Sequence, residues 1–185
     1  ARRIAYKILW NIYGRTMKIV IYYALVQAML GAFDTLYYHE YKLQLPKSGL
    51  AKLELKLHAL RDFAYSLIFI TFAWFEWHGV LAALFTSLVA GEIFITIWDF
   101  VEEDLTRKLP VGERAMHTIM AIVYGGLLAN LLPLLFQWWG QPTGILSTNY
   151  GIFSWVLTLF SIAVFGSGIR DLTASLSLPS SGRTD

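Results

Sequence analysis

The feature that most constrains the fold of this chain is the apolar stretch from Phe63 to Phe100. It is nearly twice as long as the roughly 20 residues that a helix needs to cross a bilayer, and Glu76, His78 and Gly79 interrupt it near its middle. We therefore expect two spanning helices joined by a tight turn. The chain is 56% hydrophobic and 15% charged, with a mean hydropathy of +0.52, which is too apolar for a soluble domain of 185 residues. The sequence predicts an all-α, polytopic membrane protein.

Three further apolar runs raise the number of predicted transmembrane helices to five, at residues 17–38, 62–77, 80–100, 117–139 and 152–169. Each run has about the length that a bilayer requires. Aromatic pairs at Tyr37–Tyr38 and Trp138–Trp139 end two of them, as is typical of the membrane interface. We expect the first four helices to form a bundle around a polar layer at one membrane face, with the fifth packed beside them.

The remaining regions complete the predicted organisation. Residues 1–16 mix basic and large apolar side chains, which is typical of an amphipathic helix that lies in the interface or docks on a partner. Residues 17–172 form the five-span domain, and the Ser-rich residues 173–185 are expected to be a mobile tail. The loops at 39–61 and 101–116 share one face with the C-terminus. That face holds ten of the 15 Lys and Arg residues and is expected to be cytoplasmic, although the basic N-terminus argues the other way.

Two pairs of residues have the spacing of a metal site. Glu54 and His58 are four residues apart, and so are Glu113 and His117, so each pair places a carboxylate and an imidazole on one helix face. Four-helix carboxylate sites use a similar division of ligands, with Glu-x-x-His in place of the Glu-x-x-x-His found here. We interpret these four residues as the main candidate ligands.

Further acidic and histidine residues fall at the same ends of the predicted spans. The chain has no cysteine, so any metal would be held by His, Asp and Glu, a combination that suits iron, manganese or zinc. We expect iron in a dinuclear site, with zinc, manganese or no metal as the alternatives. The candidate bridging or supporting groups are Asp34, His39, Glu40, Asp62, Asp99 and Glu103.

An interfacial set of ion pairs is the structural alternative, because the same layer holds almost enough Lys and Arg residues to balance its acids. We expect Glu102, Asp104, Lys52 and Lys56 on the solvated surface. Glu76 and His78 fall at the opposite membrane face, where they are expected to cap the turn between two spans.

Several sequence strings resemble a family of small bacterial integral-membrane proteins. They lie within residues 20–172 and read FDTLYYHEY, LHALRDFAY, AWFEWHG, WDFVEED, LPVGERAMHT and YGIFSW. The resemblance implies a bacterial multi-pass protein, which we expect in the inner membrane. It implies no catalytic residue.

The functional hypothesis is a metal-dependent membrane enzyme that oxidises or oxygenates a lipophilic substrate or a quinone. A zinc hydrolase would use the same residues, whereas a haem held by His58 and His117 is disfavoured by the acids beside them. The alternative from another class is a non-enzymatic accessory subunit that meets its partners through residues 1–16. A proton carrier would need a polar path from Glu76 to Asp99, which is sparse. Nucleic acid is not expected as a partner, because the net charge is only +2.

Overall fold

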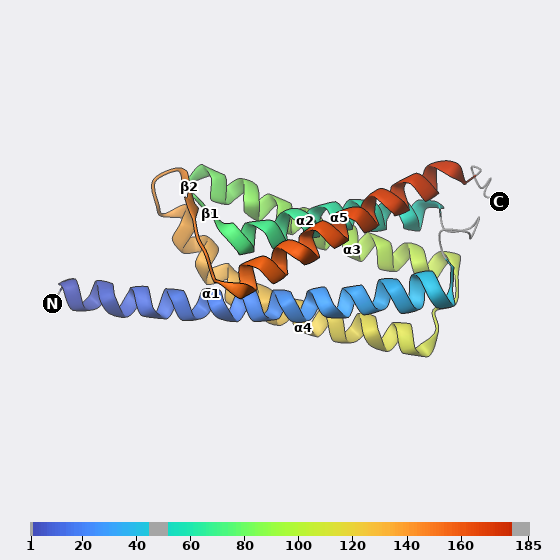
Figure 1. Ribbon diagram of the computed structural model, residues 1–185, viewed down its shortest axis with the longest axis horizontal. Helices are drawn as coiled ribbons and strands as arrows, with labels where there is room; N and C mark the ends of the chain where they lie inside the picture. The colour runs from blue at the N-terminus through green and yellow to red at the C-terminus, as the bar shows by residue number, and fades with distance from the viewer. Residues whose placement is uncertain (1, 45–51, 179–185) are drawn as a thin grey trace.

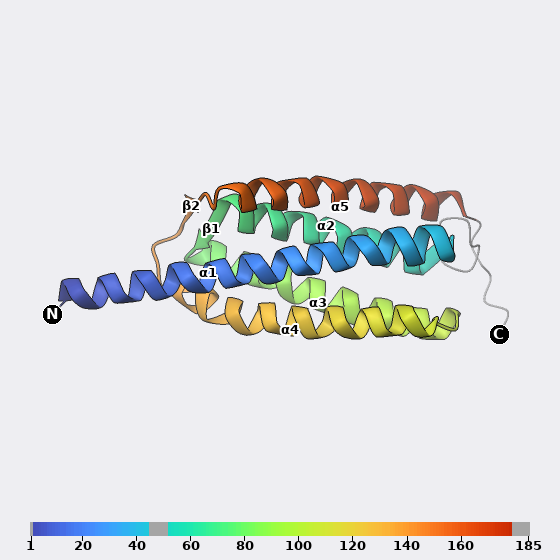
Figure 2. The same cartoon turned by 60° about the horizontal axis from the view of Figure 1, so that its bottom comes forward.

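The computed structural model describes residues 2–44 and 52–178, and it has five long α-helices within them (Figure 1). They are α1 (Arg2–Phe33), which continues into the π-helix η1 (Asp34–Lys42), then α2 (Lys52–Trp74), α3 (Val80–Thr106), α4 (Val111–Trp139) and α5 (Ile152–Ser177). The helices run along the long axis of the molecule in alternating directions (Figures 1 and 2). The predicted all-α, polytopic fold is confirmed.

Four helical segments are long and apolar enough to cross a membrane, at Gly14–Lys42, Val80–Thr106, Val111–Trp139 and Ile152–Ser177. The second predicted span, α2, has 23 residues and lies within the same bundle, but it is not among these four. Its first half contains Lys52, Glu54, Lys56, Arg61 and Asp62, which reduce its hydropathy. Of these, Glu54 and Asp62 are buried and Arg61 is half-buried, so α2 brings three charged side chains to the interior of the bundle.

The apolar core lies mainly between α1, α2, α3 and α4, and Leu157 of α5 completes it. Phe72, Phe85 and Trp138 are among its largest fully buried side chains. The closest helix neighbours are α2 with α5, α1 with α4, and α2 with α3. Helix α5 therefore packs on the outside of the four-helix arrangement, as expected.

Two glycines allow neighbouring helices to approach closely. A Cβ at Gly168 would lie 2.9 Å from the Phe63 ring and 3.2 Å from the Ala59 carbonyl oxygen, where α5 crosses α2. A Cβ at Gly126 would lie 2.7 Å from the Tyr23 ring, where α4 meets α1. Small residues at such crossings are typical of membrane helix packing.

A short β-ribbon closes one end of the bundle and was not predicted. Strand β1 (Phe75–His78) pairs antiparallel with β2 (Gly144–Ser147), so the α2–α3 connection is joined to the α4–α5 connection. The predicted turn is present, because Gly79 has φ of +59° directly before α3. The ribbon forms because the uncharged segment between α4 and α5 supplies a partner strand for the turn.

The connections at the opposite end of the bundle bring together the ends of η1 and α3 and the starts of α2 and α4, as predicted from the topology (Figure 1). The N-terminal region differs from the expectation of a separate interfacial helix. Residues 2–16 continue α1 without a break and project beyond the β-ribbon end of the bundle (Figures 1 and 2). Helix α5 extends into the predicted tail as far as Ser177, and residues 179–185 lie outside the described residues.

Candidate metal centre

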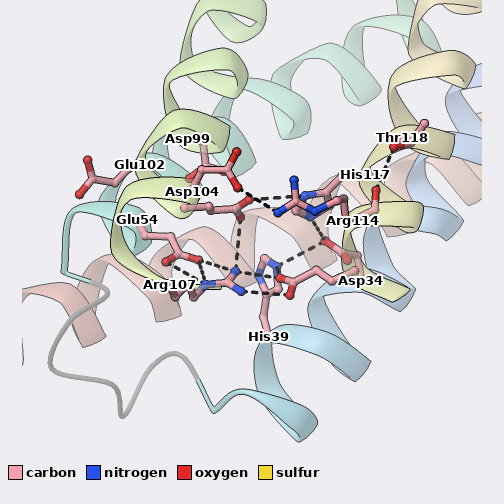
Figure 3. A network of polar contacts seen from close by, with 12 residues as sticks. Asp34, His39, Glu54, Asp99, Glu102, Asp104, Arg107, Arg114, His117 and Thr118 are labelled. Carbon is pink, nitrogen blue, oxygen red and sulfur yellow. Dashed lines mark hydrogen bonds and ion pairs between the residues drawn. The ribbon is translucent and has the colours of Figure 1, made fainter. Parts of the chain in front are cut away.

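A buried cluster of ionisable side chains occupies the end of the bundle opposite the β-ribbon (Figure 3). We call it the polar cluster. Its members come from η1, α2, α3, α4 and the α3–α4 connection, and they are Asp34, His39, Glu54, His58, Arg61, Asp99, Glu103, Arg107, Glu113 and His117. Its five carboxylates and three histidines are each at most 6% exposed. Charged groups are this thoroughly buried only when they have partners or bind an ion.

The π-helical geometry of η1 explains how one short segment contributes two of these residues. In a π-helix each N–H bonds to the carbonyl five residues back, as Leu43 N does to Tyr38 O at 2.9 Å. Residues five apart therefore lie on the same face, and Asp34 and His39 both point into the cluster, with 3.4 Å between His39 Nε2 and Asp34 Oδ2. A regular α-helix would have turned one of them away.

The two predicted Glu/His pairs both reach the cluster. His58 Nε2 lies 3.1 Å from Asp99 Oδ2 and 3.6 Å from Glu103 Oε1. His117 Nδ1 lies 3.4 Å from Glu103 Oε2. Glu103 therefore stands between the histidines of α2 and α4, with one carboxylate oxygen toward each.

Two groups of residues that could hold a metal ion result from this arrangement. One group consists of His39, Glu103, Glu113 and His117, and the other of Glu54, His58 and Glu103. Within each group, one ligand atom of every residue lies within 4.8 Å of the others. Ligands at about 2.1 Å from a metal lie up to about 4.2 Å apart, so small side-chain movements would complete either site. Because Glu103 belongs to both groups, the two sites would be adjacent.

Asp34 orients one of the histidines. His117 Nε2 lies 3.2 Å from Asp34 Oδ2, and since an ionised carboxylate only accepts hydrogen bonds, the imidazole donates from Nε2. When the imidazole is neutral, its Nδ1, which faces Glu103, therefore carries the lone pair. Metal-binding histidines are commonly fixed in this way by a carboxylate.

Arg107 joins two of the candidate ligand residues, whereas the sequence analysis counted it only among the cations of the alternative set of ion pairs. Its guanidinium donates to Glu54 at 2.9 Å and to Glu113 at 2.8 Å (Figure 3). Burial lowers the pKa of Arg107, but the hydrogen bonds and charges of Glu113 and Glu54 outweigh it and raise the pKa above its ordinary value. Arg107 is thus a fixed positive charge, and its position four residues after Glu103 was the available signal.

Arg61 is the second cation of the cluster, also missed as a site residue. It donates to Asp99 Oδ2 at 2.7 Å. Five carboxylates therefore face two guanidinium groups, which leaves three negative charges to be balanced when the histidines are neutral. Either bound cations or three imidazolium groups would balance them.

Several ligand atoms of the cluster have no hydrogen-bond partner among the described residues. Asp34 Oδ1 and Asp99 Oδ1 have no partner of any kind within the described residues, whereas His39 Nε2, His58 Nε2 and both carboxylate oxygens of Glu103 have only ion-pair contacts of 3.1–3.6 Å. Leaving a buried polar atom unpaired costs about 1–3 kcal/mol. A cation at the centre of either group would satisfy several of these atoms at once.

Two predicted site residues and one predicted surface residue need correction. Glu40 is half-exposed and pairs with Arg170 of α5, because the π-helix turns it away from the cluster. Asp62 is buried but lies outside the cluster, where it lines a cavity together with Ser167 of α5. Glu102, expected on the solvated surface, is only 8% exposed, although it points away from the cluster (Figure 3). Neither Glu40 nor Asp62 belongs to a metal-binding group.

Two other polar groups lie outside the cluster. Deep in the bundle, Glu92 accepts hydrogen bonds from Tyr124 and from Thr96. At the β-ribbon end, His78 Nε2 lies 3.3 Å from Glu76 Oε2, in keeping with the predicted capping pair. Burial and the charge of Glu76 raise the pKa of Tyr150, which donates to that carboxylate, to about 12.

A cavity of about 560 Å³ adjoins the polar cluster on the side of the membrane interior. Asp34, Arg61 and Asp62 line its polar end, and most of the remaining lining is apolar. Its volume is in the range of ordinary ligand sites, about 300–1,000 Å³. The cluster therefore has access to a space that suits a lipophilic molecule.

No family model, curated protein or solved structure matches this chain.

Proposed function

We propose that this protein is a metal-dependent enzyme of the bacterial inner membrane that oxidises or oxygenates a lipophilic substrate. The observation that carries the proposal is the pair of buried ligand groups that share Glu103 and contain several ligand atoms without a hydrogen bond. One metal would be held by Glu54, His58 and Glu103, and the other by His39, Glu103, Glu113 and His117. Three imidazoles with carboxylates and no thiolate suit iron.

The metal pair, when bound, would pass electrons from the substrate to dioxygen, which is the oxidant that this proposal requires. The residues of the chain supply the rest of the site. Asp34 holds His117 in one tautomer, and Arg107 fixes the carboxylates of Glu54 and Glu113. The adjoining cavity would place the substrate beside Asp34 and away from bulk water.

The second candidate function is a non-enzymatic subunit of a membrane assembly. It is favoured by the N-terminal part of α1, which projects beyond the bundle and could contact another protein (Figure 2). In this case three protonated histidines would balance the surplus carboxylates of the cluster, and no metal would be bound.

Metal analysis of gently purified protein, combined with three histidine variants, tests the proposal. His58→Ala and His117→Ala should each lower both the metal content and the thermal unfolding midpoint, because bound metal stabilises the folded state. His78→Ala, at the opposite end of the bundle, should leave the metal content unchanged. Metal far below one equivalent in the wild-type protein, or full retention in both cluster variants, would refute the metal centre.

A further inference from the structure

Arg61 presents unused hydrogen-bond donors to the cavity beside the polar cluster. The N–H groups of a guanidinium are spread over three nitrogens, and in Arg61 only Nη1 has an acceptor, which is Asp99 Oδ2 at 2.7 Å. The Nε and Nη2 groups form no hydrogen bond within the part of the chain that the structure describes, yet they are not among the polar atoms that are sealed away without a partner. The side chain is 14% exposed and lines the cavity, so these accessible donors face that space.

The other arginine of this lining differs, because each of its nitrogens has an acceptor. Arg170 donates from Nε to Asp171 at 2.8 Å and from Nη2 to Ser167 at 3.2 Å. Its Nη1 pairs with Glu40. A ligand in the cavity would therefore find guanidinium donors at Arg61 and not at Arg170.

The charges around Arg61 indicate that the matching acceptor is neutral. The carboxylates of Asp34 and Asp62 line the same end of the cavity. A ligand carboxylate beside Arg61 would face these like charges, which raises the cost of binding it. A carbonyl oxygen accepts hydrogen bonds without adding a charge, and its bond to a guanidinium is stronger than a bond between two neutral groups.

The rest of the lining describes the body of the ligand. Phe69, Leu128 and Phe160 contribute from α2, α4 and α5, and aromatic and aliphatic groups dominate. Such a surface binds a hydrocarbon chain or ring, and the few polar groups at one end fix its orientation.

We infer that the cavity binds one neutral lipophilic carbonyl compound, such as a long-chain ketone, an aldehyde or an alkylquinone, whose carbonyl oxygen accepts a hydrogen bond from Arg61 Nε or Nη2. The inference rests on the proposed function only in taking this molecule as the substrate of the metal centre. Binding itself needs no metal. A hydrocarbon of the same shape leaves the donors of Arg61 unpaired.

Calorimetric titration of the chelator-treated protein in lipid nanodiscs, with empty nanodiscs as the reference for partitioning, tests the inference. The probes are octanophenone and octylbenzene, which differ only in a carbonyl group that replaces a methylene group. We expect one saturable site with at least about tenfold preference for the ketone, since a hydrogen bond to a charged group contributes about that factor.

Two matched variants locate the hydrogen bond. Arg61→Lys should reduce the preference to parity, because a single ammonium nitrogen that pairs with Asp99 cannot also replace the Nε and Nη2 donors. Arg170→Lys, at the other arginine of the lining, should keep the preference. Arg61→Met combined with Asp99→Asn keeps the test independent of the folding of Arg61→Lys, because it removes both partners of the ion pair and leaves no buried charge alone.

Parallel titrations with 2-undecanone and decyl-1,4-benzoquinone separate a chain ketone from a ring-bearing ligand. Equal affinity for ketone and hydrocarbon, a preference that survives the Arg61 variants, or no saturable site would overturn the inference. Tighter binding of decanoate than of the ketones would also overturn it, in favour of an anionic ligand. A ketone preference in protein that never holds metal would instead refute only the proposed function.

Discussion

Glu103 is the residue on which both candidate metal sites depend, because it is shared by the two ligand groups. Glu103→Gln should weaken metal binding by more than the roughly 10–100-fold that the loss of a supporting partner costs, since an amide is a poor ligand. The matched control is Glu102→Gln, which changes the neighbouring buried carboxylate outside both groups. Metal content per protein in the two purified variants measures the difference. Equal metal content in both would exclude Glu103 as a shared ligand.

Arg107 makes opposite contributions to stability and to metal binding. Replacing it with Gln leaves Glu54 and Glu113 without their shared cation, so the metal-free protein should lose roughly 3 kcal/mol of unfolding free energy. The greater surplus of negative charge should at the same time tighten metal binding, so added metal should restore part of the stability. Unfolding in mild detergent with and without metal measures both effects.

Arg114 provides the control for this experiment. Its ion pair with Asp104 has both side chains 60% exposed, so Arg114→Gln should change stability by less than about 1 kcal/mol. Loss of stability in Arg107→Gln with no rescue by any divalent metal would support a purely structural cluster.

At the scale of the elements, the contact between α2 and α5 depends on Gly168. A methyl group there meets Phe63 and the Ala59 carbonyl, so Gly168→Ala should destabilise the protein by about 1–3 kcal/mol through overpacking. Gly166 lies on the same helix with open space around it, and Gly166→Ala should be neutral or stabilise by up to about 1 kcal/mol. Thermal unfolding of the two variants in one detergent compares them. Equal midpoints would show that the helices adjust without cost.

The elements that follow simple periodicity were predictable from the sequence. The apolar runs located the helices, and the four-residue spacing in Glu54/His58 and Glu113/His117 identified the ligand-bearing faces of α2 and α4. The π-helix η1 was not predictable, because no spacing rule for an α-helix places Asp34 and His39 on one face and Glu40 on another. The specific role of Arg107 was not predictable, because it requires Glu54, 53 residues away, to lie beside it.

The β-ribbon was missed for a related reason. Phe75–His78 reads as the end of an apolar helix, and only its pairing with Gly144–Ser147 makes it a strand. Local sequence carries little information about such a partner.

For the whole molecule, the dependence of stability on pH distinguishes a metal centre from a cluster of ion pairs. Metal ligands must be deprotonated, so metal content and stability should fall together as the pH is lowered through about 6.5 to 4, where free imidazole and carboxyl groups titrate. A cluster held by three imidazolium groups would behave in the opposite sense, because raising the pH removes the charges that pair with the carboxylates. Metal content and unfolding midpoint measured between pH 5 and about 8 distinguish the two. Stability that rises on acidification, with no metal bound, would contradict the metal centre.

The charges on α2 also have a consequence for biogenesis. An Asp, Lys or Arg at the centre of a helix opposes membrane insertion by about 2.5–3.5 kcal/mol, so α2 alone should insert poorly. Helix α3, which follows after a short turn, is apolar enough to insert by itself. We expect α2 to enter the bilayer only together with α3, as a hairpin whose buried charges find partners on the neighbouring helix. Glycosylation mapping in microsomes, with α2 alone and with α2–α3, measures this, and efficient insertion of α2 alone would contradict it. The helix that carries Glu54 and His58 would then be the one that inserts least readily by itself. Assembly of the metal centre would depend on α3 being synthesised directly after it.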